Sequence, residues 1–300
     1  MLYLLLSILF SVLLLVNFRV FPKYEISTLQ AIAFNYPVCF ITGLLLMPAG
    51  QHFDLDLSQN WTWYCLALGF GFILTFVLSG AATQKIGMTL TSMANNVSLV
   101  IPVSMSLFVF KGQIKEFDTL NYLGLLLALV AVAIATFRSD KSQSKQSFWT
   151  QGGLALAVFL MYGITNTAIN YLNIHYIPDP SLAIPVTLVM VLGAAISGIV
   201  LFAYRIIRGQ ESFKPKNILA GITLGVPNFL SFYLLILTLT HFGNSGAFVY
   251  PIYNMGVILG STFISILFFK EKLSLINKLG LGLALLAIFL ISYQEVFQMF

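Results

Sequence analysis

The sequence predicts an all-α membrane protein with ten transmembrane helices, arranged as two inverted five-helix repeats. Three observations lead to this prediction. Apolar residues make up 59% of the 300-residue chain and charged residues only 8%, against about half and about a quarter in soluble domains. Ten apolar runs are each long enough to cross a bilayer, and part of the first half recurs in the second. This composition excludes soluble enzymes, disordered chains and nucleic-acid binders.

A membrane helix needs about 20 mostly apolar residues. Ten runs meet this requirement, and the first of them is expected to be a retained span rather than a signal peptide. All acidic residues fall between these runs or in the tails, where they avoid the cost of a charge in hydrocarbon. The runs lack the alternation of a β-barrel, so each is expected to be a helix. The spans cover residues 2–18, 27–48, 61–84, 88–110, 119–137, 151–172, 181–204, 217–240, 245–269 and 273–293.

The chain is expected to divide at its most polar stretch, SDKSQSKQS. We predict a first repeat over residues 1–138, a polar linker over 139–150 and a second repeat over 151–300. LGLLLALVA at 123–131 aligns with LGLGLALLA at 279–287, and in the same register Asn121 aligns with Asn277. Five helices are an odd number, so the two repeats must cross the membrane in opposite directions. Many secondary transporters are built in this way, with the binding site near mid-membrane.

Positive charge favours the cytoplasmic side of a membrane. The loops after the odd-numbered spans carry thirteen Lys and Arg residues, whereas the opposite set carries only Lys111 and Lys115. Both termini are therefore predicted to be non-cytoplasmic. The expected location is the cell membrane, which would be the inner membrane in a bacterium.

The polar residues inside the spans are neutral and are the candidate site residues. Tyr162, Asn166 and Asn170 follow one another at four-residue spacing and share a helix face. Asn95, Ser98 and Pro102 are likewise expected on one face of the fourth span. Each polar residue has an alternative role as a hydrogen-bonding link between helices. The candidate substrate-binding residues are Asn17, Asn35, Tyr36, Asn95, Ser98, Tyr162, Asn166, Asn170, Asn228, Tyr250 and Asn254, and the candidate hinges are Pro102 and Pro251.

No pattern in the chain indicates enzyme chemistry. There is no metal-ligand spacing, no glycine-rich nucleotide motif and no pair of carboxylates within a span. Cys39 and Cys65 lie in apolar runs and are expected to be packing residues. We therefore expect neither catalysis, nor a metal, nor a cofactor. Neutral amides and hydroxyls can hydrogen-bond a neutral or zwitterionic solute, but they do not neutralise a strong charge.

Three segments resemble the EamA-type transporters of the drug/metabolite transporter superfamily. They are FFKEKLSLINKLGLGLALLAIFLI at 268–291, QKIGMTLTSMANNVSLVIPV at 84–103, and the pattern Tyr162-Gly163-x-x-Asn166. The resemblance covers nearly the whole chain in span number and repeat. It implies a ten-helix transporter that moves small metabolites, often out of the cell. The first half departs from the family, because it has KGQIKE where a Gly-Glu-Arg-like turn is usual.

The expected function is a secondary transporter or facilitator for a small neutral or zwitterionic metabolite such as an amino acid. Export by alternating access around a central polar cavity, one half rocking against the other, is the expected mechanism. The expected partners are the solute and the lipid bilayer, and the fused halves favour a monomer. Two alternatives remain: flippase-like handling of a lipid-linked intermediate, which needs a lateral opening, and a non-transporting interaction protein, which would have a dry, packed centre.

Overall fold

The computed structural model describes residues 1–110, 117–136, 145–176, 182–243 and 246–298. Throughout these ranges the regular elements are helices, so the predicted all-α class is confirmed. Nine described helical stretches are long and apolar enough to cross a membrane, and α6 is a shorter apolar helix. The elements are α1 Leu2–Val20, η1 Phe21–Tyr24, α2 Thr28–Leu45, α3 Asn60–Lys85, α4 Met88–Val97, α5 Val100–Met105, η2 Ser106–Phe110, α6 Thr119–Thr136, α7 Lys145–Tyr176, α8 Ala183–Ile207, α9 Lys216–His241, α10 Gly246–Phe269 and α11 Leu275–Gln298.

The fourth span, predicted as one helix, is broken in the structure. α4 ends at Val97 and α5 begins at Val100, although Ser98 and Leu99 between them keep right-handed helical dihedral angles, with φ of −58° and −53°. That Asn95, Ser98 and Pro102 share one face remains a prediction. Pro102 has no N–H to donate to the carbonyl of Ser98 four residues earlier. That carbonyl instead accepts the N–H of Ile101 at 3.0 Å. The span then continues as the π-helix η2.

α7 begins earlier than the sequence predicts. Its first residue, Lys145, lies within the stretch expected to be a linker, while residues 139–144 fall outside the described ranges. Lys and Gln are good helix formers, which explains a helical start in polar sequence. The 32 residues of α7 extend about 48 Å at 1.5 Å per residue. This exceeds a hydrocarbon core of about 30 Å, and the apolar span Gly152–Leu172 leaves helical residues beyond it at both ends of α7.

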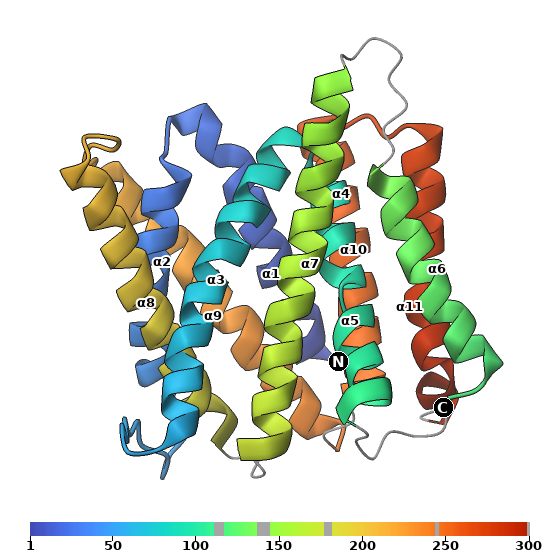
Figure 1. Cartoon of the computed structure of the whole chain (residues 1–300), viewed down its shortest axis with the longest axis horizontal. Helices are drawn as coiled ribbons and strands as arrows, with labels where there is room; N and C mark the ends of the chain where they lie inside the picture. The colour runs from blue at the N-terminus through green and yellow to red at the C-terminus, as the bar shows by residue number, and fades with distance from the viewer. Residues whose placement is uncertain (111–116, 137–144, 177–181, 244–245, 299–300) are drawn as a thin grey trace.

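Equivalent helices of the two halves run in opposite directions. Figure 1 shows α1 rising from the lower end of the bundle while α7 descends, and α6 rising while α11 descends. The first helix of each half packs against the third and fourth spans of the other half. α1 contacts α9 and α10, and α7 contacts α3 and α4. The two termini consequently lie toward the same end of the bundle (Figure 1).

The helices gather into two groups, and each group contains helices from both halves of the sequence (Figure 1). We call α2, α3, α8 and α9 the α2/α8 group, and α4, α5, η2, α6, α10 and α11 the α6/α11 group. α1 and α7 stand between them. One hydrophobic core includes Leu188 and Leu224 of the α2/α8 group, and a second includes Met93 and Ile288 of the α6/α11 group. The sequence halves are therefore not separate bundles.

Glycine permits the closest approach of helices within a group. A Cβ atom placed on Gly69 of α3 would lie 2.2 Å from the backbone nitrogen of Ala194 on α8. Between α10 and the bridging helix α1, by contrast, a Cβ on Gly256 would meet only the end of the Ile8 side chain, at 2.4 Å. The backbones of α3 and α8 are therefore in direct contact, whereas α10 and α1 are separated by a side chain that can change its conformation.

Polar bonds also fasten each group internally. In the α6/α11 group, Asn121 donates to the carbonyls of Leu290 and Ile291 at 3.0 and 3.1 Å. In the α2/α8 group, buried Gln30 donates to the carbonyl of Ser212 at 2.7 Å. Among the hydrogen bonds between described residues, none joins a side chain of one group directly to the other. The two groups meet chiefly through α1 and α7.

Candidate functional site

Five hydroxyl side chains from five helices lie in the same region, between the two groups. The hydroxyls of Ser11 and Tyr253 share a hydrogen bond of 2.6 Å. Tyr162 lies within electrostatic range of both Tyr36 and Tyr253, and Ser79 is within reach of its hydroxyl. We call these five residues the hydroxyl cluster. It joins α1, α2, α3, α7 and α10, and so includes both bridging helices and a helix from each group.

Two members of the hydroxyl cluster are buried without a hydrogen-bond partner. The Tyr36 hydroxyl has none among the described residues, and Ser79 faces Tyr162 without a hydrogen bond of good geometry. A buried hydroxyl left unpaired costs about 1–3 kcal/mol. Such a group in a native protein is commonly explained by a bound water or by the polar group of a ligand.

The tyrosines of α7 and α10 combine deep placement with access to solvent. Tyr162, Tyr250 and Tyr253 are embedded among protein atoms, yet each is partly accessible and Tyr250 is 46% exposed. Tyr176, which is 37% exposed, has little protein around it because it lies at the surface. Deep but accessible side chains are typical of an internal space that opens to solvent. Tyr250 lies one turn from the start of α10, which places this access toward the end of the bundle that carries the termini.

Asn35 and Asn228 connect α2 to α9 beside Cys39. The amide of Asn228 donates to Asn35 Oδ1 at 3.2 Å, and Cys39 Sγ donates to the carbonyl of Gly225 at 3.2 Å. Asn35 Nδ2 is buried without a partner among the described residues. The pair therefore links two helices and still leaves one donor unused.

Asn17 and Asn170 form hydrogen bonds between helices away from the hydroxyl cluster. Asn17 Nδ2 donates to the carbonyl of Thr223 at 3.2 Å and its Oδ1 accepts from Thr223 Oγ1 at 2.9 Å. Asn170 Nδ2 donates to Ser106 Oγ of η2 at 2.7 Å. For both residues the structure shows the interhelical link that the sequence left open as an alternative, and substrate binding by them remains a prediction.

The remaining candidates are distributed around the centre. Asn166 is half-buried one helical turn from Tyr162, and Asn254 is half-buried next to Tyr253. Asn95 is also half-buried, and its carbonyl accepts the hydroxyl of buried Ser98. Pro251 lies inside a continuous α10, in contrast to the break beside Pro102. The binding and hinge roles of these residues remain predictions.

Ser11, Ser79 and Tyr253 were not among the site residues predicted from the sequence. Tyr253 lies between the two candidates Tyr250 and Asn254, so the polar run of α10 carried a usable signal. A single serine in an apolar helix is a common packing residue, and neither Ser11 nor Ser79 could be distinguished by residue type.

The hydroxyl cluster is electrically neutral. Acidic side chains such as Glu211 and Glu271 lie at helix ends or in turns. Among the described residues, His, Cys, Asp and Glu form no cluster of three or more that could hold a metal ion. The centre can therefore offer hydrogen bonds and aromatic surface, but no compensating charge.

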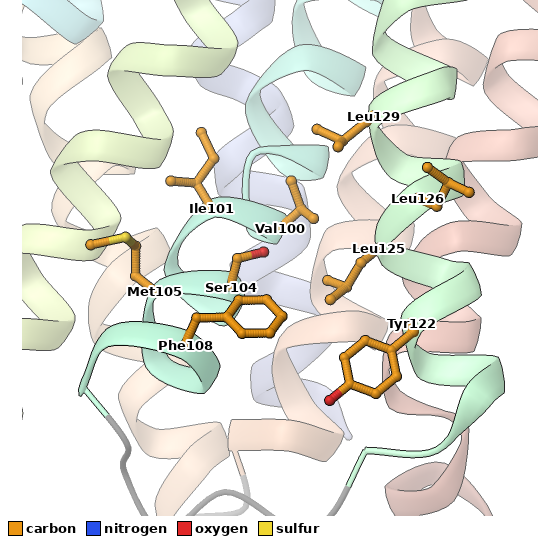
Figure 2. A pocket seen from close by; sticks show the side chains of 9 residues that line it. All are labelled: Val100, Ile101, Ser104, Met105, Phe108, Tyr122, Leu125, Leu126 and Leu129. Atoms are coloured by element: carbon orange, nitrogen blue, oxygen red, sulfur yellow. The ribbon is translucent and has the colours of Figure 1, made fainter.

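A pocket of about 400 Å³ lies apart from these residues, between α5–η2 and α6 (Figure 2). Its walls are almost wholly apolar, and it includes none of the candidate site residues. The residues around it are Val100, Ile101, Ser104, Met105, Phe108, Tyr122, Leu125, Leu126 and Leu129.

Comparisons with known proteins match this architecture. Residues 150–293 match the model of the EamA-like transporter family. A curated protein of Haemophilus influenzae, described as an uncharacterized protein, is 27% identical over 294 residues, which are 96% of this chain and 97% of that protein. A solved crystal structure is similar with a TM-score of 0.60 and 15% identity, covering 98% of this chain and 95% of that one. At that identity the likeness concerns the fold alone.

Proposed function

We propose, from the premise that residues 150–293 belong to the EamA-like transporter family, that this protein is a secondary transporter or facilitator for a small organic metabolite. Members of that family are membrane transporters rather than enzymes. The proposed cargo is a neutral or zwitterionic solute such as an amino acid, and the proposed direction is export. The proposed location is the cell membrane, with both termini non-cytoplasmic.

The observation that carries the proposal is the hydroxyl cluster. Ser11, Tyr36, Ser79, Tyr162 and Tyr253 place neutral polar groups where the two helix groups meet. Polar groups at such depth are unfavourable in a membrane protein unless they are satisfied or used. Hydroxyls without protein partners suit a solute that brings its own donors and acceptors. The hydroxyl cluster carries no charged side chain that could neutralise a strongly ionic solute, so we propose an uncharged or zwitterionic one.

The arrangement of the cores favours a particular movement. If each sequence half moved as a rigid body, residues of both hydrophobic cores would be pulled apart, because each core contains helices of both halves. Movement of the α2/α8 group against the α6/α11 group leaves the first core intact and separates the second only from the end of α3, which contributes Leu78 and Ala82. Alternating access would then proceed around the hydroxyl cluster, with α1 and α7 repacking through side chains. This replaces the half-against-half rocking expected from the sequence.

The proposal is tested by counterflow in proteoliposomes. The purified protein is reconstituted with a panel of radiolabelled amino acids and neutral metabolites, and exchange is compared with that of empty liposomes. Tyr162→Phe removes one hydroxyl of the cluster and should slow exchange by about tenfold, the effect of roughly 1.4 kcal/mol. Tyr204→Phe is the matched control, because Tyr204 is exposed near the end of α8. Exchange that equals empty liposomes across the panel, or equal effects of the two variants, would contradict the proposal.

A second candidate is flippase-like handling of a lipid-linked intermediate. The pocket between α5–η2 and α6 favours it, since Phe108 and Leu126 at its rim are exposed on the side of the bundle. Translocation of a fluorescent lipid-linked sugar in the same liposomes, without exchange of small solutes, would favour this function. The accessible Tyr250 disfavours the third reading, a non-transporting protein with a dry centre.

A further inference from the structure

We propose that the pocket between α5–η2 and α6 is a binding site for one acyl chain of a membrane lipid. The site is separate from the hydroxyl cluster and does not depend on which solute the protein carries. Its bound chain would be a resident one, which exchanges more slowly than the lipid around the bundle.

Two helix faces border the pocket, and they meet at its floor, where Val100 and Leu125 belong to one core. On α6, Tyr122, Leu125 and Leu126 follow the spacing of a single helix face, as do Val100, Ser104 and Phe108 on α5–η2 (Figure 2). The opposite side of α6 packs closely against α11, where a Cβ on Gly124 would lie 2.9 Å from the backbone nitrogen of Ile291. The pocket-facing side of α6 thus packs against less protein than the side toward α11.

Neither empty space nor water suits this pocket. Protein interiors are close-packed, and an empty space of about 400 Å³ would forfeit the dispersion contacts of all the side chains around it. A buried water needs 2–4 polar partners, and the pocket offers little beyond the hydroxyls of Ser104 and Tyr122. A hydrocarbon chain can fill this pocket, because it makes dispersion contacts with the apolar side chains and needs no hydrogen-bond partner.

The shape of the pocket points to a chain that enters from the bilayer. Its rim residues Phe108 and Leu126 are 64% and 60% exposed, whereas Val100 and Leu125 at its floor are 2% and 7% exposed. The rim is continuous with the outward face of a membrane helix, which already contacts lipid tails. Tyr122 lies about one turn inside α6, and tyrosine is enriched where membrane helices reach the lipid headgroups.

A chain in this position would hold α5–η2 in place against α7. Ile101, at the edge of the pocket, packs on Gly163, where an added Cβ would lie 2.1 Å from its Cδ1. Ser106 of η2 accepts the hydrogen bond of Asn170 on α7. Gly163 directly follows Tyr162. A chain in the pocket would therefore support α7, the helix that carries Tyr162 of the hydroxyl cluster.

Photo-crosslinking with an exchange step tests the proposal. The protein is placed in nanodiscs of phosphatidylethanolamine that carries a diazirine in one acyl chain, and excess unlabelled lipid is then added before illumination. Crosslinked peptides are mapped by mass spectrometry. Crosslinks in residues 100–108 and 122–129 should persist roughly tenfold longer than those at Phe263, an exposed residue of α10, because a chain held between two helices makes more dispersion contacts than a chain on one exposed face.

A pair of variants on α6 provides the control. Leu126→Trp fills the rim of the pocket and should remove the persistent crosslinks. Val130→Trp adds the same bulk to an exposed position of α6 outside the pocket and should leave them unchanged. Equal exchange at the pocket and at Phe263 would overturn the proposal, as would crosslinks that Leu126→Trp does not reduce. Loss of a dimer in native mass spectrometry of Leu126→Trp would also overturn it, since a second copy would then occupy the pocket.

Discussion

Glu271, in the turn between α10 and α11, accepts a hydrogen bond from the backbone N–H of Met88 at 3.1 Å. Met88 is the first residue of α4, so a carboxylate from the second half of the chain caps a helix of the first half. Gly87 makes this approach possible, because its φ is +96° and a Cβ there would lie 2.4 Å from Glu271 Oε1. Ser265 donates to the same carboxylate.

Replacing this cap should lower the stability of the fold. Glu271→Ala removes the acceptor at the N-terminus of α4 and should cost about 1 kcal/mol. Glu271→Gln keeps an oxygen in place and should cost less. Thermal unfolding of the two variants in the same detergent measures the difference. If both variants unfold at the temperature of the unchanged protein, the bond to Met88 does not contribute to stability.

Two glycines of α3 should respond oppositely to alanine. Gly69→Ala places a Cβ 2.2 Å from the backbone of Ala194, which must shift, and should cost about 1–3 kcal/mol. Gly71→Ala meets the ends of two side chains, Thr165 Cγ2 at 3.3 Å and Leu68 Cδ1 at 3.7 Å, and alanine is the better helix former by about 1 kcal/mol. Fluorescence-detected size-exclusion after heating would rank them. The same melting temperature for both would show that α3 and α8 are not held together as tightly as the structure indicates.

Asn166→Ala should reduce transport without affecting folding. Asn166 is half-buried one turn from Tyr162, and the structure gives it no hydrogen bond among the described residues that its loss would break. A reduction of roughly tenfold in counterflow would match the loss of one hydrogen bond to the solute. Membrane accumulation and melting temperature are the controls. Normal transport by the variant, or failure to accumulate, would leave the assignment of Asn166 without support.

Acid should loosen the contact between α6 and α11. The Tyr293 hydroxyl donates to Asp118, and this bond is the main cause that lowers the pKa of the Asp118 carboxyl below its ordinary value of 3.8. A carboxylate with a lowered pKa in the folded protein stabilises the fold above its ordinary pKa, and this contribution is lost as the pH falls through the lowered value. Tyr293→Phe should return the pKa of Asp118 toward its ordinary value, so the variant should be less stable near neutral pH and should lose less stability in acid.

Melting temperatures measured between about pH 2 and pH 6 would check this sign, because the contribution is lost below the ordinary pKa of 3.8. Asp118→Asn is the control, because it removes the titrating group and should flatten the difference from the unchanged protein in that range. A Tyr293→Phe profile that overlays the profile of the unchanged protein would refute the role of this bond.

Spin labels should separate movement between groups from movement between halves. Ile199 on α8 and Trp63 on α3 belong to the α2/α8 group but to different halves, whereas Leu286 on α11 belongs to the other group. Distances between labelled cysteines should change for the Ile199–Leu286 pair when a transported solute is added. The Trp63–Ile199 distance should stay constant. Cys39 and Cys65 are buried and remain as they are. A change in the Trp63–Ile199 pair would favour movement of the sequence halves.

The fold was largely predictable because bilayer thickness imposes a length on every apolar run. The ten predicted spans agree with the helices of the described residues, and the resemblance to the EamA family is confirmed by the match over residues 150–293. The break at Ser98 was not predicted, although Pro102 was the residue that causes it. A proline within a membrane helix is often tolerated, so its presence alone does not predict a break.

The site was less predictable, because its members are defined by which helices meet. Tyr36 and Tyr162 were identified as polar residues within spans, but nothing in their spacing placed them near Ser79 or Tyr253. Asn17 and Asn170 had the same appearance in the sequence, yet they pair with Thr223 and Ser106. Residue type predicts a need for a partner, whereas only the packing of helices determines which partner it finds.

The interleaving of the halves also constrains how the chain can be made. While a ribosome is still synthesising the second half, α2 lacks the α8–α9 turn that receives Gln30, and α6 lacks the α11 carbonyls that receive Asn121. The nascent first half therefore has five inserted helices but no finished core of its own. Polar side chains such as Gln30 and Asn121 therefore remain without their final partners, in the insertion machinery or in lipid, until the second half is inserted. Folding of the bundle is completed only when the last helix has been synthesised.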